Sequence, residues 1–288
     1  MKKSFQKTQH RREDGQAYKH DLGQHFLHDK ALLESLVAST GLTSEDTVLE
    51  IGPGSGMLTA CLCAAAKHVI AVEADESLLP YLRVQMEPYA NFTLVQGDIR
   101  RQNLSELCKP LGQKFFIVAN IPYSITTALF DLFWQSGLPI RQISVMIQKE
   151  VAEKLTARPS QDQYGLLSVR CQYYCEPSLE CIVPAEAFTP PPKVDSAFIH
   201  LPMRSAPPLP VHNEKLLFQL IKAGFGMRRK TLVNALKGVL SLDGDTVRDI
   251  LATMDFSPTV RGEALSISDW IRFSNACQCR LTLPENNP

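Results

Sequence analysis

An amide, a rigid turn and an aromatic ring stand together in Asn120-Ile121-Pro122-Tyr123. The apolar run before them, residues 115–119, is typical of a buried strand, and Pro122 ends its ladder because proline has no N–H to donate. Ligands bind at the carboxyl ends of strands in open α/β sheets. There the side-chain carbonyl of Asn120 and the backbone carbonyl of Ile121 could accept both hydrogens of an exocyclic amine, with Tyr123 flat on the attached ring. The segment predicts a site for a planar amino-base, although a strand-ending Asn-x-Pro turn is the plainer interpretation.

A glycine turn, Gly52-Pro53-Gly54-Ser55-Gly56, lies between a predicted strand (47–51) and a predicted helix (57–67). Strand, glycine turn and helix form the start of a nucleotide-binding βαβ unit, because glycine lets a ligand approach the backbone closely. The G-x-G-x-G spacing differs from that of dinucleotide sites. Glu50, just before the turn, would repel a pyrophosphate but not a cationic amino acid.

Two acids follow at the ends of the next predicted strands. Glu73 follows the strand 68–72, and its distance in sequence from the glycine turn suits an acid that binds ribose hydroxyls. Asp98 follows the strand 92–96, where it could accept a hydrogen bond from the amine of an adenine ring. A solvated strand-end acid and a turn cap are the alternatives. Because parallel strands end at one edge of a sheet, Gly52, Gly54, Glu73, Asp98 and Asn120 should converge. Together they suit S-adenosylmethionine, a nucleoside that carries a zwitterionic amino acid and a sulfonium.

The alternation of helix (126–135) and strand (143–148) then changes. Residues 166–174, 179–183 and 196–201 are predicted as strands without long intervening helices, so the sheet should end in antiparallel strands. Between the last two lies Phe188-Thr189-Pro190-Pro191-Pro192. Three prolines stiffen this segment, which could hold Phe188 over a cleft to sandwich a base with Tyr123. The alternative is a connector with Phe188 in the core.

The second half ends in a different pattern. Residues 205–210 are predicted as a linker, and helices are predicted at 214–226, 228–240, 245–254 and 268–276. A stretch without acids carries five basic residues, which suggests contact with the phosphates of a nucleic acid, although a solvated helix face would look the same. These residues are Lys222, Arg228, Arg229, Lys230 and Lys237. A second basic group lies in the first 19 residues, at Lys2, Lys3, Lys7, Arg11, Arg12 and Lys19.

Bulk properties exclude several classes. The 288 residues carry zero formal net charge, so local clusters must attract any charged partner. No apolar run approaches the roughly 18 residues of a membrane span, and the polar N-terminus lacks the apolar region of a secretory signal. The spacing of the eight cysteines fits neither zinc, an iron–sulfur cluster nor a disulfide framework. We therefore expect a cytoplasmic protein without metal or membrane partners, with buried free thiols.

Nine segments in order resemble the ribosomal RNA adenine dimethyltransferase family of the kasugamycin-sensitivity type. They are GQHFL (23–27), LEIGPGSGMLT (49–59), VEAD (72–75), GDI (97–99), NIPYSITT (120–127), QKEVAEKL (148–155), YGLLSV (164–169), FTPPPKVDSA (188–197) and RRKTLVNAL (228–236). The resemblance implies an α/β fold: a basic tail (1–22), a Rossmann-like class I methyltransferase domain (23–204) and a small all-helical domain (205–288). It also implies dimethylation of two adjacent adenosines in a small-subunit rRNA hairpin on an assembling particle, by a monomer.

Two residues depart from the family pattern. His25 stands where the family usually has Asn, in a segment that borders the methionine end of the cofactor, so that the backbone contacts of His25 and Leu27 should survive. Ala128 replaces a proline that commonly follows the NIPY motif, which should loosen the start of a helix.

Three other functions were compared with this one. An erythromycin-resistance-type adenine methylase acting on large-subunit rRNA shares the NIPY core, but FTPPPKVDS and RRKTLVNAL favour the small-subunit enzyme. A non-catalytic RNA-binding relative or a transcription factor would not need Glu73, Asp98 and the NIPY motif together. An NAD oxidoreductase is disfavoured by the glycine spacing.

Overall fold

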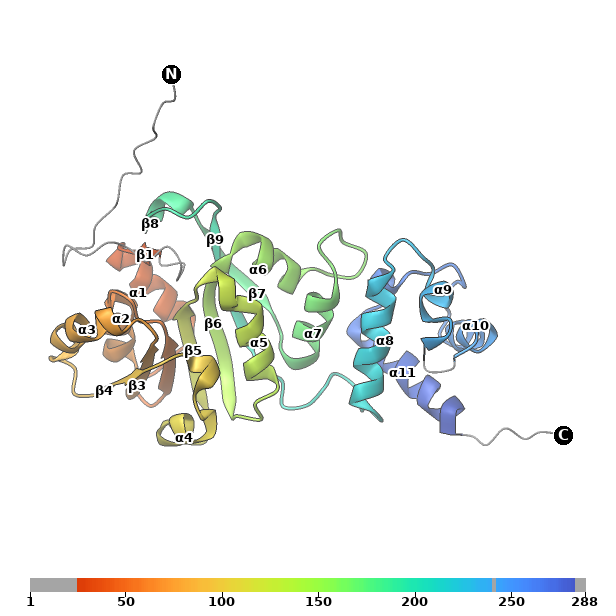
Figure 1. Cartoon of the computed structure of the whole chain (residues 1–288), viewed down its shortest axis with the longest axis horizontal. Coiled ribbons are helices and arrows are strands. Elements are labelled where there is room, and N and C mark those ends of the chain that lie inside the picture. The colour runs from red at the N-terminus through yellow and green to blue at the C-terminus, as the bar shows by residue number, and fades with distance from the viewer. Residues whose placement is uncertain (1–24, 240–241, 283–288) are drawn as a thin grey trace, which may run out of the picture. The chain divides into compact units, whose positions relative to one another are not determined.

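The computed structural model describes residues 25–239 and 242–282 (Figure 1). The predicted basic tail, Gly23 and Gln24 lie outside these residues. The described chain divides into two compact units, the first comprising the residues up to Ala152 with Ser178–Pro202, and the second Glu153–Pro177 with the residues from Met203 on. The predicted boundary at residue 205 thus differs from this division, because residues 153–177 pack with the C-terminal helices.

The first unit is built on a seven-stranded sheet with the order β4-β3-β2-β5-β6-β9-β7. The first five strands in this order are parallel, β9 is antiparallel to its neighbour β6, and β7 is antiparallel to β9. The chain changes direction across the sheet between β2 and β5, which is where a doubly wound sheet opens a crevice for ligands. The bounds are β2 Thr47–Ile51, β3 His68–Glu73, β4 Phe92–Gln96, β5 Phe115–Asn120, β6 Ile140–Gln148, β7 Ser178–Val183 and β9 Ser196–Pro202.

Five helices accompany the parallel strands. Asp29 caps α1, since its carboxylate accepts from the Leu32 N–H at 3.0 Å. Apolar side chains of α1 and α2 pack on one face of the sheet, where Leu36 and Leu62 meet Val48 and Phe116 in one buried cluster. The helices are α1 Lys30–Ser39, α2 Met57–Ala65, α3 Leu79–Met86, α4 Leu104–Cys108 and α5 Thr126–Trp134. These layers confirm the Rossmann-like architecture.

A second, two-stranded sheet joins segments far apart in the chain. Strand β1 (Phe26–Leu27) pairs antiparallel with β8 (Phe188–Thr189), so that Leu27 lies opposite Phe188. The pairing ties the segment after the predicted tail to the start of the proline-rich stretch.

The second unit is helical, as predicted, but two of its segments were predicted wrongly. Residues 166–174 form helix α7 (Leu166–Tyr174) rather than a strand, because α7 packs on α8 and α11 and its first turn is held by Ser168, whose hydroxyl accepts from the Gly165 N–H at 3.0 Å. The helix predicted at 228–240 is only α9, since Thr231 caps it. The bounds are α6 Lys149–Thr156, α8 Glu214–Gly226, α9 Leu232–Leu236, α10 Gly244–Thr253 and α11 Ile267–Thr282, with α6 crossing the division between the units.

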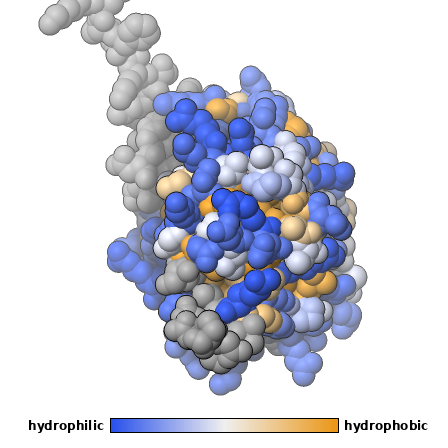
Figure 2. Space-filling model, turned by 90° about the vertical axis from the view of Figure 1, so that its right-hand side faces the viewer, coloured by the Kyte–Doolittle hydropathy of each residue, from blue (hydrophilic) through white to orange (hydrophobic). Residues whose placement is uncertain are grey.

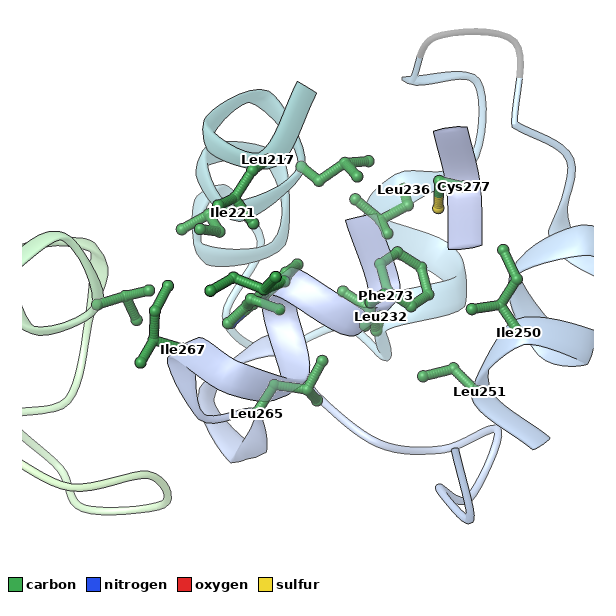
Figure 3. Close-up of a cluster of buried hydrophobic side chains, with 14 of the residues drawn as sticks. Leu217, Ile221, Leu232, Leu236, Ile250, Leu251, Leu265, Ile267, Phe273 and Cys277 are labelled. Atoms are coloured by element: carbon green, nitrogen blue, oxygen red, sulfur yellow. The ribbon is translucent and has the colours of Figure 1, made fainter. Parts of the chain in front are cut away.

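The core of the helical unit is apolar (Figure 3). Leu217 and Ile221 of α8 face Leu232 and Leu236 of α9, with Phe273 of α11 between the helices. Outside this core, hydrophilic residues cover most of the face seen in Figure 2, with small hydrophobic areas between them. The helices are therefore held by one shared apolar core, as amphipathic helices require.

Candidate active site

A cavity of about 400 Å³ lies at the carboxyl ends of the parallel strands. Its volume is in the range of small-molecule sites. The structure brings together in its wall ten of the residues predicted to bind a cofactor or a target base. They are His25, Leu27, Gly52, Gly54, Glu73, Asp98, Asn120, Ile121, Pro122 and Tyr123. The strand-end residues thus lie together around one cavity, as the sequence predicts.

The glycine turn after β2 needs its glycines. Gly52, Gly54 and Gly56 have φ values of 69°, 58° and 78°, in the left-handed region that other residues rarely adopt. A Cβ added at Gly54 would also overlap the ring of Phe26. The turn therefore has little freedom, and it keeps its backbone open to the cavity.

Glu73 at the end of β3 is fixed by the backbone. One carboxylate oxygen accepts from the Asp75 N–H at 2.7 Å and the other from the Gly54 N–H at 3.2 Å. Burial raises the pKa of Glu73, and these two hydrogen bonds oppose the rise. Because both oxygens are held, the carboxylate presents its remaining lone pairs to the cavity in one orientation.

Glu50, one residue before the end of β2, was expected to tolerate a cationic amino acid but was not among the residues predicted to bind the cofactor. Its side chain is 1 % exposed and lies in the cavity wall, and neither oxygen hydrogen-bonds to any residue that the structure describes. Burial raises its pKa to about 8, which the nearby hydroxyl of Thr59 opposes and the charge of Glu73 reinforces. A buried acid without partners favours a cationic group beside it. In the sequence, its position directly before the glycine turn is the feature that indicates a site residue.

Asp98, after β4, is held by a side chain instead. Arg100 donates to both of its oxygens, with Nη2 2.6 Å from Oδ2 and Nε 2.9 Å from Oδ1. These hydrogen bonds lower the pKa of Asp98. Arg100 also lines the cavity and was not predicted, since an arginine two residues after a turn cap is common on surfaces. An adenine amine at Asp98 must share the carboxylate with this guanidinium.

At the end of β5, Asn120 is oriented by a backbone carbonyl. Its Nδ2 donates to the His25 carbonyl oxygen at 2.9 Å, which leaves the side-chain oxygen Oδ1 as the acceptor. The neighbouring Ile121 N–H donates to the Met146 carbonyl oxygen at 3.2 Å and fixes the turn. Both groups of the predicted amine clamp are therefore held: the Asn120 side chain by the His25 carbonyl, and the backbone of Ile121 by Met146.

Tyr123 is fixed at its far end. Its hydroxyl lies 2.6 Å from Ser196 Oγ, a partner from β9 that the sequence did not indicate. Burial raises the pKa of Tyr123, and the Ser196 hydrogen bond opposes this. The ring is thus a neutral, immobilised aromatic surface at the cavity.

Phe188 is not brought to the cavity. Its side chain is 2 % exposed and packs in the apolar cluster beneath α1 and α2, opposite Leu27. The pairing of β8 with β1 turns the ring into the core, which is the alternative considered for this residue. The observed conformation does not support a base sandwich made by Tyr123 and Phe188.

The basic stretch of the helical unit is not uniform. Arg228 donates through Nη2 to the carbonyl oxygens of Asp162 and Tyr164, at 3.1 and 3.2 Å, and it pairs with Glu263 at 3.2 Å. Its guanidinium is committed to holding a loop. The other four cations, Lys222, Arg229, Lys230 and Lys237, are exposed.

Residues 25–239 and 242–282 contain no group of three His, Cys, Asp or Glu side chains placed to hold a metal. In the same part of the chain no helix is long and apolar enough to cross a membrane. The eight cysteines are free thiols, six of them buried.

The parallel sheet, glycine turn and strand-end acids define a class I methyltransferase fold. Residues 15–272 match the family described as ribosomal RNA adenine dimethylase, and the chain belongs to this family. It is 40% identical over 270 residues to "Ribosomal RNA small subunit methyltransferase A" of Enterococcus faecalis, with 92% of each chain covered. The protein of that name from Lactococcus lactis is 41% identical over 263 residues, covering 90% of each.

Two solved structures share nearly the whole architecture. A dimethyladenosine transferase from Plasmodium falciparum aligns with a TM-score of 0.74 at 26% identity, over 86% of this chain and 96% of that one. The 23S rRNA methyltransferase ErmE aligns with a TM-score of 0.71 at 25% identity, over 88% of this chain and 99% of that one. The fold is therefore common to a dimethyladenosine transferase and a 23S rRNA methyltransferase.

Proposed function

We propose that this protein uses S-adenosylmethionine to dimethylate two adjacent adenosines in a hairpin near the 3′ end of small-subunit (16S) rRNA, during ribosome biogenesis. In this proposal it acts as a cytoplasmic monomer on an assembling particle. The observation that supports it most is the orientation of Asn120, whose Nδ2 is held by the His25 carbonyl while Oδ1 is left to accept, beside the ring of Tyr123.

The cavity residues suit S-adenosylmethionine. The buried, unpartnered carboxyl of Glu50 fits the ammonium group of the methionine part, and the fixed carboxylate of Glu73 fits the ribose hydroxyls. Asp98 would accept from the adenine amine while it keeps Arg100. When bound, the cofactor supplies an electrophilic methyl group on a sulfonium.

The residues of this chain would prepare the nucleophile. The amine of adenine is weakly nucleophilic because its lone pair is delocalised into the ring. Asn120 Oδ1 and the Ile121 carbonyl, by accepting both amine hydrogens, draw the nitrogen toward a tetrahedral geometry and localise that lone pair. Orientation of two bound partners can supply about 7–11 kcal/mol. No strong base is required, since the nitrogen becomes cationic as it takes the methyl from sulfur, and its proton is then acidic enough to leave to water. Stacking on Tyr123 would add about 1–3 kcal/mol to the binding of an unstacked base.

The choice of substrate rests on the relatives. Those that are about 40% identical are named for the small subunit, whereas ErmE, named for 23S rRNA, is 25% identical. The TM-scores of 0.74 and 0.71 do not separate the two substrates. Large-subunit adenine methylation is therefore the second candidate.

The test is transfer of labelled methyl groups to purified small- and large-subunit particles that lack the modification. We expect label only in small-subunit rRNA, and dimethyladenosine after digestion and chromatography. Label confined to large-subunit rRNA would overturn the proposal in favour of the second candidate.

A further inference from the structure

The side chain of His25 lies against Tyr123. The two ring centroids are 5.7 Å apart and the ring planes are inclined by 26°. Nδ1 of His25 is 2.7 Å from the Pro190 carbonyl oxygen, and since a carbonyl only accepts, Nδ1 carries the proton in this contact. The backbone carbonyl of His25 also accepts a hydrogen bond from the Asn120 side-chain amide. His25 therefore touches three parts of the site at once.

Of the two rings, Tyr123 is the better fixed. Its hydroxyl is bonded to Ser196 at 2.6 Å, and its backbone begins a 3-10 turn directly after Pro122. Among the described residues, the His25 ring hydrogen-bonds to one partner, the Pro190 carbonyl oxygen. Any change in the distance between these rings should therefore come from His25.

A planar base stacked on both rings needs about 7 Å between them, twice the roughly 3.4 Å separation of stacked bases. The observed centroid distance is 5.7 Å, so the His25 ring must move away from Tyr123 before a base can lie between the two rings. Phe188 is 2 % exposed in the core and would have to leave it to do the same. We propose that the His25 side chain is the second wall of the target-base slot, facing Tyr123, and that it moves back to admit the adenine. This rests on the proposed function.

The role of the ring can be separated from that of the backbone. All substitutions at position 25 keep the carbonyl that orients Asn120. His25→Phe keeps a flat ring and loses Nδ1, whereas His25→Ala and His25→Asn lose the ring. A matched control is His28→Ala, because His28 is an exposed histidine three residues away.

The experiment measures single-turnover methylation of small-subunit particles against particle concentration, with cofactor affinity measured separately by calorimetry. We expect His25→Ala and His25→Asn to raise the half-saturating particle concentration about 5- to 140-fold, the equivalent of one lost stack of about 1–3 kcal/mol. His25→Phe should bring the half-saturating concentration most of the way back to the wild-type value, and His28→Ala should leave it unchanged. Cofactor affinity should change less than threefold in all variants.

Three outcomes would overturn the inference. If His25→Ala matches the wild type, the ring does not contact the base. If His25→Ala binds particles more tightly, His25 is a cap that the base displaces. If His25→Phe is as poor as His25→Ala, the Pro190 hydrogen bond matters and stacking does not. Methylation of small-subunit adenosine by the wild type establishes the proposed function in the same assay, so failure of the inference is distinguishable from failure of that function.

Discussion

At the carboxyl edge of the sheet, Glu73, Asp98 and Asn120 all line one cavity, whereas in the basic segment 222–237 one of the five cations, Arg228, is bonded to carbonyl oxygens and the other four are exposed. The hydrogen-bond register of parallel strands brings their ends to one edge whatever the side chains are. A cation beside a helix end has no such constraint. Residue type alone therefore predicted the first region better than the second.

The largest expected effect concerns Glu50. Its pKa of about 8 in the folded protein lies above the ordinary 4.5, so unfolding releases a proton between these pH values. The free energy of unfolding of the cofactor-free protein should fall as pH rises from about 4.5 to about 8, by several kcal/mol at about 1.4 kcal/mol per pKa unit. Glu50→Gln should lose this component. Denaturant unfolding at pH 5, 6.5 and 8 measures it, and equal pH dependence in both proteins would show that Glu50 is not a buried acid.

The second effect concerns Asn120. Removing the acceptor by Asn120→Ala should slow single-turnover methyl transfer about 10²–10³-fold, as loss of one oriented transition-state hydrogen bond does elsewhere. Cofactor and particle affinities should change little, since an interaction specific to the transition state lowers the rate constant. Asn120→Asp keeps an oxygen acceptor but loses the Nδ2 contact to His25. Its transfer rate should lie between those of the wild type and Asn120→Ala. A near-normal rate in Asn120→Ala would show that Asn120 does not prepare the amine and that residues 120–123 form only an ordinary turn.

Glu73 should show its effect on cofactor binding and not on the rate constant. Two charge-assisted hydrogen bonds to ribose are worth about 1.5–3 kcal/mol each, so Glu73→Ala should weaken cofactor affinity about a hundredfold or more. Glu73→Gln keeps one acceptor oxygen and should lose less. Calorimetry on folded variants gives the answer, and unchanged affinity in Glu73→Ala would remove the ribose assignment.

The smallest effect tests the basic segment. Each neutralised phosphate contributes about 0.7–0.9 to the slope of log affinity against log salt. The double change Arg229→Gln with Lys230→Gln should flatten this slope by about 1.4–1.8 for small-subunit particles. Arg228→Gln is the matched control, because it should lower the unfolding temperature through loss of the Asp162, Tyr164 and Glu263 contacts and leave the slope alone. A flatter slope in Arg228→Gln would make the five cations one surface after all.

Several failures of prediction have a common cause. Residues 166–174 are apolar enough for a buried strand, yet they form α7 because α8 and α11 offer a helix-shaped partner. Phe188 is buried because β8 pairs with β1, more than 160 residues earlier in the chain. Arg228 donates hydrogen bonds to the carbonyl oxygens of residues 162 and 164. In each case the partner is distant in sequence, and no local pattern names it.

By itself the sequence determined the alternation of strands and helices up to residue 148, the glycine turn at 52–56 and the strand-end positions of Glu73, Asp98 and Asn120, because these depend on local periodicity and backbone preference. Tertiary structure alone decided which distant groups face Asn120 and Tyr123, namely the His25 carbonyl and the Ser196 hydroxyl. It also left Glu50 buried without a partner. Burial and hydrogen-bond partners depend on segments that meet only when the chain folds, and so the chemistry of the strand ends is set there.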